Sequence, residues 1–349
     1  MLVVRADGNA KIGAGHLMRC LTIADAVRRL SAREDVNANG SKEIMFICAD
    51  EDSARLARDR GYRADVPGTG ADIWSPGITG PNHTILVDHY DVTDAYLEGL
   101  QQYGKVFMLD DMQKHAYPVD GVINYNVFVD AEIYQKLYAG QQTECFLGAK
   151  YAPLREQFQQ VNYEIRPEVR QVLLTTGGGD RDNIAGQILD EVYSSDMVYH
   201  VLVGRFSPNF AYWQERMQAQ PNIQVHYDVQ DMAGMMQMCD LAITAGGSTI
   251  YELAAVGVPF VCFSYAENQE ALVEYIGRAQ TGGSAGAWHV DPAKCRKRIK
   301  EIYGNLCRDR ELRRQYGARE RTLTDGQGAL RLAKILMAET GTTDRKNEG

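Results

Sequence analysis

The chain has 349 residues, of which 45% are hydrophobic and 24% charged, and its net charge is −9. This length exceeds one typical domain and fits two domains that each bury their own core. The composition excludes a disordered or fibrous chain. Because the net charge is negative and no Lys/Arg block occurs, we expect no nucleic-acid partner and no anionic-membrane partner.

The seven cysteines are scattered along the chain without a Cys-x-x-Cys pair. Several stand in apolar, strand-like contexts, so we expect reduced core residues. The N-terminus lacks a signal-peptide pattern, and no apolar run approaches the roughly 18 residues of a membrane-spanning helix. The sequence therefore predicts a cytoplasmic protein without membrane insertion, and it leaves the oligomeric state open.

Short runs rich in Val and Ile alternate with amphipathic stretches of helical length, and this alternation occurs twice. The pattern is typical of βαβ units around a parallel sheet. In the first half we expect a helix from Gly15 to Leu30 and a polar surface loop from Ser31 to Lys42. The strands predicted there are Leu2–Arg5, Ile44–Cys48, Thr84–Asp88, Val106–Leu109, Gly121–Ile123 and Cys145–Leu147.

The second half repeats the pattern after a linker that we place around Tyr151–Pro167. We therefore predict a Rossmann-like N-terminal domain over residues 1–155 and a Rossmann-like C-terminal domain over residues 156–340. The latter includes an amphipathic helix from Gly328 to Glu339, and residues 341–349 are expected to form a disordered tail. The strands predicted in this half are Val172–Thr175, Tyr199–Val203, Ile223–Val225, Leu241–Thr244 and Phe260–Phe263.

The first predicted strand runs into a turn that contains Gly13 and Gly15 and leads directly into a helix. Such a turn lets a ligand approach the backbone closely. His16 falls in the first helical turn, where the helix dipole disfavours the imidazolium, so the ring should stay neutral and able to accept a proton. His16 is therefore a candidate general base, and a hydrogen-bonded turn residue is the alternative.

A dinucleotide site is a second interpretation of this turn. Met18 stands where the third glycine of G-x-G-x-x-G would help the helix to pack. Asp50, after the second strand, resembles a helix cap more than a ribose ligand. The sequence therefore gives NAD little support, and we expect no cofactor.

A glycine-rich run in the second half carries the stronger anion-binding signal. Gly246 and Gly247 leave room for a phosphate, Ser248 and Thr249 offer hydroxyls, and the helix that follows points its amides at the same place. Glu252, one turn into that helix, is placed to accept hydrogen bonds from a ribose. A solvated glutamate that favours the helix dipole is the alternative.

Two other polar segments follow strands in this half. The turn Thr176–Asp180 contains Gly178, and its amides either line a phosphate or form a tight turn only. Asn268 and Gln269 begin a helix after the last predicted strand. Their side chains either reach a sugar or phosphate or serve only as a helix start.

Taken together, these motifs resemble the PseG-type UDP-sugar hydrolases of pseudaminic acid biosynthesis. The N-terminal pattern R-x-D-(x)4-I-G-x-G-H-x-x-R-C includes Asp7, His16 and Arg19. The similarity continues at VDHY, LDD, LGAKYAPLREQF, GGGD, GGSTIYELAAVGVP and ENQE, and it covers the chain from Met1 to about Gln280. Those enzymes act on UDP-2,4-diacetamido-2,4,6-trideoxy-beta-L-altropyranose, and their wider relatives are the MurG-like glycosyltransferases.

The resemblance implies an α/β protein of the GT-B class, with two Rossmann-like domains whose parallel sheets face a central cleft. It assigns the general base to His16, the sugar site to Tyr90 and the uridine ribose to Glu252. Asp7 would help to shape the catalytic pocket. The residues implied to bind the UDP-sugar are Gly13, Gly15, Arg19, Gly178, Gly246, Gly247, Ser248, Thr249, Glu252, Asn268 and Gln269.

The expected reaction is an inverting attack of water on the anomeric carbon, with UDP as the leaving group. Backbone amides and a helix dipole, rather than a metal, would stabilise the diphosphate. Asp110 and Asp111 keep a metal site open as an alternative. A glycosyltransferase that uses the same residues, a non-catalytic nucleotide-sugar-binding protein and an NAD-dependent sugar enzyme are the rival functions.

Overall fold

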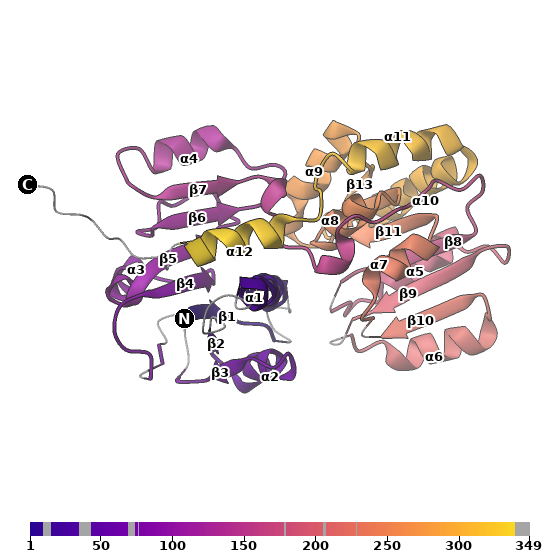
Figure 1. The fold of residues 1–349 in the computed structure, drawn as a ribbon. Coiled ribbons are helices and arrows are strands. Elements are labelled where there is room, and N and C mark those ends of the chain that lie inside the picture. The colour runs from indigo at the N-terminus through magenta and orange to yellow at the C-terminus, as the bar shows by residue number, and fades with distance from the viewer. Residues whose placement is uncertain are drawn as a thin grey trace, which may run out of the picture. The chain divides into compact units, whose positions relative to one another are not determined.

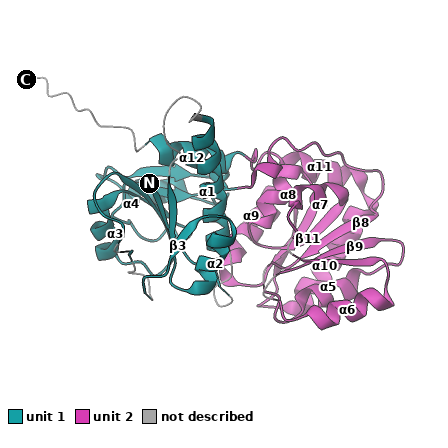
Figure 2. Ribbon diagram, turned by 60° about the horizontal axis from the view of Figure 1, so that its bottom comes forward, with its two compact units in different colours: residues 1–153, 327–349 teal, residues 154–326 magenta. Residues whose placement is uncertain are grey.

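The computed structural model of the chain describes residues 1–9, 15–34, 43–68, 74–75, 77–177, 179–204, 207–227 and 229–338. These residues form alternating strands and helices along the chain (Figure 1). They divide into two compact units, which Figure 2 colours separately. Unit 1 contains Met1–Pro153 and the C-terminal stretch that begins at Gln327, and unit 2 contains Leu154–Gly326.

Unit 1 is built on a parallel sheet with strand order β3-β2-β1-β4-β5-β6-β7. Its inner strand β1 is buried at every residue, as expected for a parallel strand covered on both faces. In the register, Leu2 lies opposite Ile44 on one side and Thr84 on the other. The strands are β1 (Leu2–Ala6), β2 (Ile44–Ile47), β3 (Arg63–Asp65), β4 (His83–Asp88), β5 (Gly104–Leu109), β6 (Gly121–Asn124) and β7 (Glu144–Leu147).

The helices of unit 1 each present an apolar side to this sheet or to one another. In α1, Leu17, Leu21, Ala24 and Val27 are buried at the spacing of one helical face. Asp50 caps α2, because its carboxylate accepts a hydrogen bond from the Ser53 amide at 2.8 Å. The helices are α1 (Gly15–Glu34), α2 (Glu51–Asp59), α3 (Asp94–Leu100), α4 (Ala131–Leu137) and α12 (Gly328–Ala338).

The last helix differs from its predicted place. We had assigned it to the C-terminal domain, but α12 packs against α1 and belongs to unit 1 (Figures 1 and 2). Gly328 makes this return possible, since a Cβ there would lie 2.1 Å from the carbonyl oxygen of Ala152. The hydroxyl of Thr84 on β4 donates to the carbonyl of Leu336 at 3.1 Å. Unit 1 is therefore completed by a segment far away in the sequence.

Unit 2 contains a second parallel sheet, with strand order β10-β9-β8-β11-β12-β13. Its core is apolar and includes the fully buried side chains of Tyr199 and Trp213. The strands are β8 (Gln171–Thr175), β9 (Val198–Val203), β10 (Ile223–Tyr227), β11 (Leu241–Ala245), β12 (Phe260–Ser264) and β13 (Gly283–Ala287). The helices are α5 (Ile184–Val192), α6 (Phe210–Ala219), α7 (Met232–Met238), α8 (Thr249–Val256), α9 (Glu270–Ala279), α10 (Pro292–Arg308) and α11 (Arg310–Glu320).

Every predicted strand is present, and two strands were not predicted. β3 is only three residues long, and β13 reads Gly-Ser-Ala-Gly-Ala, a composition that does not favour a strand. Close packing requires glycine at position 283, because a Cβ on Gly283 would lie 2.5 Å from the side chain of Ile302. The predicted loop from Ser31 also differs, since α1 continues to Glu34.

Several predictions fall outside the described residues: those on Gly13, on Gly178, on residues 35–42 and on the tail at 341–349. None of the helices in the described part of the chain has the length and apolarity needed to cross a bilayer.

Candidate functional site

The imidazole of His16 is held by a carboxylate from a neighbouring strand. His16 opens α1 just after β1, and Asp88 is the last residue of β4, which pairs directly with β1. Parallel strands end at the same edge of a sheet, so the two side chains meet there. Nδ1 of His16 lies 2.7 Å from Oδ1 of Asp88. The His16 side chain keeps 18% of its surface exposed, whereas Asp88 keeps 1%.

This contact determines which ring nitrogen carries the proton. Nδ1 of His16 must be the donor, because a lone pair at Nδ1 would face the carboxylate of Asp88 at 2.7 Å. Nε2 then holds the lone pair of the neutral ring. Among the described residues, Nε2 makes no hydrogen bond. The arrangement has the form of a histidine base oriented by a buried aspartate.

Arg19, one turn further along α1, grips the same carboxylate with two hydrogen bonds. Its Nε and Nη2 donate to Oδ2 and Oδ1 of Asp88, each at 2.6 Å. Its Nη1 donates to Oδ2 of Asp111 and to the hydroxyl of Tyr125, each at 2.8 Å. The guanidinium therefore joins two acids that follow neighbouring strands, β4 and β5.

Tyr90 stands on the open side of this cluster, with 49% of its surface exposed. Its ring meets the His16 ring edge-on, with 4.7 Å between the centroids. Its hydroxyl donates to Oδ2 of Asp111 at 3.3 Å. Burial and the nearby charge of Asp111 raise the pKa of Tyr90, so the phenol keeps its proton for Asp111 at neutral pH, and its oxygen can accept a hydrogen bond from a ligand.

The charges of the cluster are strongly coupled. Burial alone would raise the pKa of Asp88, but the charge and hydrogen bonds of Arg19, together with His16, hold it well below its ordinary value. Burial alone would lower the pKa of Arg19, but the carboxylates of Asp111 and Asp88 raise it well above its ordinary value. Two carboxylates and one guanidinium leave one net negative charge beside the ring of His16. A proton accepted by His16 would cancel that charge.

Asp7 belongs to a different set of contacts. It is 3% exposed, and its carboxylate accepts hydrogen bonds from Arg5 and from the Ala49 amide, each at 2.7 Å. Nε2 of His89 lies 3.3 Å from it. Burial would raise the pKa of Asp7, but His89 and Arg5 lower it. Its described partners do not include His16, so Asp7 joins β1 to the residues that follow β2 and β4.

The glycine run of unit 2 has the geometry of an anion site. Gly246 and Gly247 follow β11, and Ser248 is the residue before α8. The side chain of Ser248 is exposed and makes no capping hydrogen bond. Among the described residues, the amides of Ser248 and Thr249 have no backbone acceptor. Two amides and a hydroxyl are thus available at the positive end of a helix dipole.

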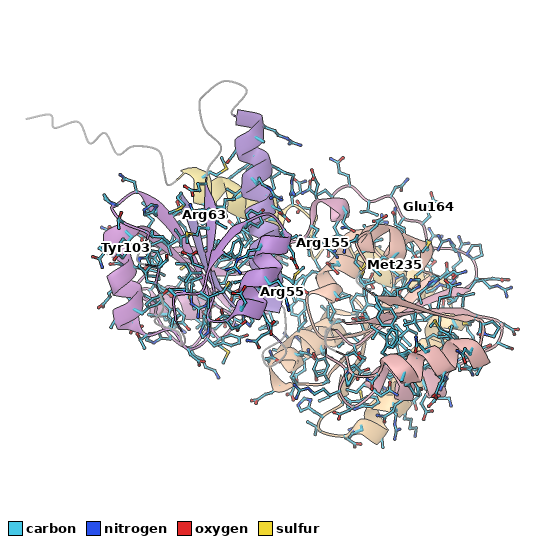
Figure 3. The ribbon with its side chains drawn as sticks, turned by 90° about the horizontal axis from the view of Figure 1, so that it is seen from below. Arg55, Arg63, Tyr103, Arg155, Glu164 and Met235 are labelled. Atoms are coloured by element: carbon cyan, nitrogen blue, oxygen red, sulfur yellow. The ribbon has the colours of Figure 1, made fainter. Side chains whose placement is uncertain are left out.

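Glu252 lies in the first turn of α8 and is held by Arg155 (labelled in Figure 3), whose Nη2 donates to Oε1 at 3.0 Å. The Glu252 side chain is 15% exposed. Burial raises the pKa of Glu252, and the charge of Arg155 opposes this rise. No described residue bonds the second carboxylate oxygen, which leaves an acceptor for a ligand hydroxyl.

The remaining predicted residues of unit 2 lie at the same edge of its sheet, since they follow β8 and β12. Asn268 is exposed, whereas Gln269 is half-buried and accepts a hydrogen bond from the Tyr265 amide at 3.1 Å. In the turn after β8, Gly177 has a φ of +88°, which favours glycine. Asp180, in the same turn, accepts hydrogen bonds from two amides at the start of α5.

Comparisons with known proteins agree with this arrangement. The solved structure of MurG from Acinetobacter baumannii superposes with a TM-score of 0.64 at 11% identity, covering 97% of this chain and 99% of that one. The calicheamicin glycosyltransferase CalG4 superposes with a TM-score of 0.61 at 13% identity, covering 98% of this chain and 99% of that one. The chain has the GT-B fold.

No protein-family model matches this GT-B chain. Its relatives by sequence cover most of the chain but have low sequence identity to it. An uncharacterised protein of Methanocaldococcus jannaschii is 24% identical over 84% of this chain and 60% of its own length. The spore coat polysaccharide biosynthesis protein SpsG of Bacillus subtilis is 23% identical over 95% of this chain and 96% of its own.

The UDP-2,4-diacetamido-2,4,6-trideoxy-beta-L-altropyranose hydrolase of Campylobacter jejuni is 23% identical over 79% of this chain and 96% of its own length. The resemblance to PseG-type hydrolases is thus confirmed as distant homology.

Asp110 and Asp111, which the sequence analysis considers as an alternative metal site, have different hydrogen-bond partners in the structure. Asp110 is 2% exposed and accepts a hydrogen bond from the hydroxyl of Tyr134, while Asp111 bonds Arg19. Within the described ranges, no group of three His, Cys, Asp or Glu residues is arranged to hold a metal ion.

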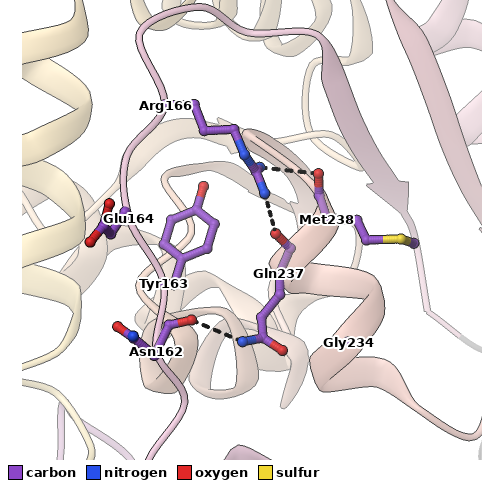
Figure 4. Close-up of a pocket in the computed structure, with 7 residues that line it drawn as sticks. All are labelled: Asn162, Tyr163, Glu164, Arg166, Gly234, Gln237 and Met238. Atoms are coloured by element: carbon purple, nitrogen blue, oxygen red, sulfur yellow. Dashed lines mark hydrogen bonds between the residues drawn. The ribbon is translucent and has the colours of Figure 1, made fainter.

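A hollow of about 510 Å³ lies elsewhere in unit 2, between α7 and the segment before β8 (Figure 4). Its lining includes Gln237, whose side chain donates to the carbonyl of Asn162 at 2.9 Å, and Arg166, whose guanidinium donates to the carbonyls of Gln237 and Met238. None of the residues predicted for the site of this GT-B protein lines this hollow.

The prediction missed two residues that hold the first-unit cluster together, Asp88 and Asp111. Both stand in motifs that carry the family resemblance, but Asp88 was assigned no role and Asp111 was considered only as part of a metal site. The sequence held a signal for both acids, because each lies at or just after the carboxyl end of a predicted strand. Asp88 ends β4, which lies next to β1, the strand that leads to His16, and Asp111 follows β5, which lies next to β4.

Proposed function

We propose that the chain hydrolyses a UDP-linked diacetamido-trideoxyhexose to the free sugar and UDP. The observation that carries this proposal is the contact of 2.7 Å between His16 and Asp88, which leaves the lone pair of a neutral His16 on Nε2, in a side chain that is 18% exposed. Homology to a hydrolase of C. jejuni named for this substrate supports the choice of reaction.

In the proposed mechanism, Nε2 of His16 removes a proton from a water molecule. The water oxygen forms a bond to the anomeric carbon while the bond from that carbon to the UDP oxygen breaks, and its electron pair leaves with the diphosphate. The anomeric configuration inverts. The proton turns His16 into an imidazolium, which the buried carboxylate of Asp88 stabilises.

Unit 2 is proposed to hold the nucleotide. The free amides of Ser248 and Thr249 and the dipole of α8 would receive the charge of the leaving diphosphate, with Gly246 and Gly247 giving it room. The second carboxylate oxygen of Glu252 would accept hydrogen bonds from the ribose. Further contacts to the nucleotide or sugar are proposed for Gly13, Gly15, Gly178, Asn268 and Gln269.

The test is incubation with UDP-activated diacetamido-trideoxyhexoses in water enriched in oxygen-18. Release of UDP with the label in the free sugar is the expected outcome, and label in the phosphate would reject attack at the anomeric carbon. A His16→Asn variant should lose about 10²–10⁴-fold in kcat, the range of a positioned general base, and still bind UDP.

The matched control is His115→Asn, because His115 also pairs with an aspartate, Asp94, but is half exposed. This control should keep full activity. Full activity in His16→Asn would remove His16 from the role of base.

A glycosyltransferase is the second candidate, because the structure superposes on MurG over nearly its whole length. In that case an acceptor hydroxyl takes the place of water in the same step. The same incubation separates the two functions. UDP release that requires an added acceptor identifies a transferase, and UDP binding without release identifies a non-catalytic binding protein.

A further inference from the structure

Four of the five N–H bonds of Arg19 are already used by protein acceptors. Arginine carries five N–H bonds: one on Nε and two on each Nη. Nε and one N–H of Nη2 are used by Asp88, and the two of Nη1 by Asp111 and Tyr125. Nη2 also lies 3.1 Å from Nδ1 of His16, but a protonated Nδ1 cannot accept a hydrogen bond, so one N–H of Nη2 has no acceptor among the described residues. The Arg19 side chain is also 90% buried, since only 10% of its surface is exposed.

We propose that Arg19 is a positioning residue that holds the base and the exposed tyrosine in one rigid unit, and that it does not bind the diphosphate. This inference rests on the proposed function, and it replaces the role that the sequence had suggested for Arg19. Through Asp88 the guanidinium sets the ring of His16, and through Asp111 it sets the hydroxyl of Tyr90.

The effect on His16 follows from the two hydrogen bonds on Asp88. A carboxylate held at both oxygens by a planar fork cannot rotate about its own axis. Oδ1 therefore stays in front of Nδ1 of His16, and the ring keeps its proton on that nitrogen. A side chain at position 19 that lacks the fork would release Asp88, and both tautomers of the ring would then be populated.

The same geometry orients the substrate. The charge of Arg19 is already balanced by Asp88 and Asp111, and these three side chains together carry one net negative charge. Such a cluster repels a diphosphate and accepts an uncharged group. The exposed ring of Tyr90 lies at this cluster, so the uncharged sugar, rather than the diphosphate, is the part of the substrate that meets unit 1.

The first experiment needs no substrate. We would record the ¹⁵N shifts of the His16 ring in ligand-free protein and assign them by their absence from His16→Asn. The wild-type protein should show the neutral ring with its proton on Nδ1. Arg19→Gln should show a mixture of both tautomers. Arg19→Lys keeps the charge but loses the fork, so it should show the same mixture, and it serves as the test if Arg19→Gln does not fold.

The control is Arg28→Lys, because Arg28 also lies on α1 but is half exposed and pairs with Asp25. Its spectrum should match the wild type. An unchanged tautomer in Arg19→Lys would overturn the positioning role, whether or not the wild-type protein releases UDP. If wild-type protein releases no UDP while the tautomer does change, the proposed hydrolysis fails and the positioning of His16 stands.

The second experiment separates positioning from binding. In Arg19→Lys, kcat for UDP release should fall by about 10²-fold, while the Kd for UDP stays within twofold of the wild type. A rise of tenfold or more in that Kd would show that Arg19 binds the nucleotide and would overturn the inference.

Discussion

The two units use opposite means to handle charge. In unit 1, side chains neutralise side chains: Arg19 forms ion pairs with both Asp88 and Asp111 and links them into one cluster. In unit 2, the site consists mainly of backbone, with free amides at Ser248 and Thr249 and glycines before them. The first arrangement orients the ring of His16, and the second leaves donors open to a ligand.

This difference predicts different sensitivities. A cluster of coupled charges depends on every member, because the loss of one leaves another buried without its partner. A backbone site depends on space, because amides are present whatever the side chain, and only an added Cβ can obstruct them. Five substitutions test the comparison, ordered from the largest expected effect to the smallest.

Asp88→Asn should have the largest effect. The amide cannot hold His16 in the required tautomer, so kcat should fall by about 10⁴-fold, as when the aspartate of a catalytic triad is replaced by asparagine. Arg19 would lose a buried partner, and the free energy of unfolding should fall by about 3–5 kcal/mol. UDP release and urea denaturation measure the two effects.

The control for this variant is Asp52→Asn, which removes an exposed carboxylate paired with Arg55. It should change neither quantity measurably. Wild-type kcat in Asp88→Asn would show that the cluster is not the catalytic site.

Gly246→Ala and Gly247→Ala separate packing from ligand space. A Cβ on Gly246 would lie 2.8 Å from Cγ2 of Val273 and 3.2 Å from the carbonyl of Gln269, so this variant should lose about 1–3 kcal/mol of stability. A Cβ on Gly247 meets no atom within 4 Å, so its thermal midpoint should stay unchanged.

Calorimetric titration of both glycine variants with UDP measures their affinity for the nucleotide. Weaker UDP binding in Gly247→Ala, without a change in stability, would show that the nucleotide occupies the space beside the glycine. Unchanged UDP affinity in both variants would place the nucleotide elsewhere.

Glu252→Ala should weaken UDP binding by about tenfold, the effect of losing one good hydrogen bond to a ribose. Glu274→Gln, on an exposed face of α9, is the control and should bind UDP normally. A matched titration with uridine diphosphate and its 2′,3′-dideoxy analogue sharpens the test, because the variant should no longer distinguish them. Normal affinity in Glu252→Ala would discard the ribose role.

Glu320→Gln should have the smallest effect, and it acts on stability alone. Glu320 ends α11 and is 0% exposed, and burial raises its pKa well above the ordinary value of 4.5, while the Phe260 backbone and Arg321 offset this only in part. Its contribution to stability is therefore complete below the ordinary pKa and is lost as the pH rises through the folded-state pKa. Glutamine mimics the protonated acid, so the variant should be more stable than the wild type at pH 8 and equal to it near pH 4.

The pH dependence of Asp88 has the opposite sign. Its pKa is lowered in the folded state, so its contribution is complete above the ordinary value of 3.8 and is lost as the pH falls through the folded-state pKa. Urea denaturation of both variants across this range measures the two slopes. Glu311→Gln, exposed on the same helix as Glu320, is the control for the rise at pH 8. Equal stability of Glu320→Gln and wild type at pH 8 would contradict the argument.

The two parallel sheets could be predicted from the order of residues, because buried parallel strands appear as apolar runs and each run is a local signal. The order of residues also identified His16 as a candidate base and the glycine run before Glu252 as a candidate anion site, since a turn that leads into a helix is visible within a few residues. These features depend on neighbours along the chain.

The contacts of those residues, in contrast, could be seen only in the folded chain. Asp88 is 72 residues from His16, and Asp111 is 92 residues from Arg19, so no local pattern revealed that one guanidinium joins them. α12 packs against α1, although all the residues of unit 2 lie between them in the sequence. β13 forms in a glycine-rich segment because α10 packs close against it. Hydrogen bonds and close packing act between atoms that folding brings together, and the order of residues along a chain does not state which atoms those are.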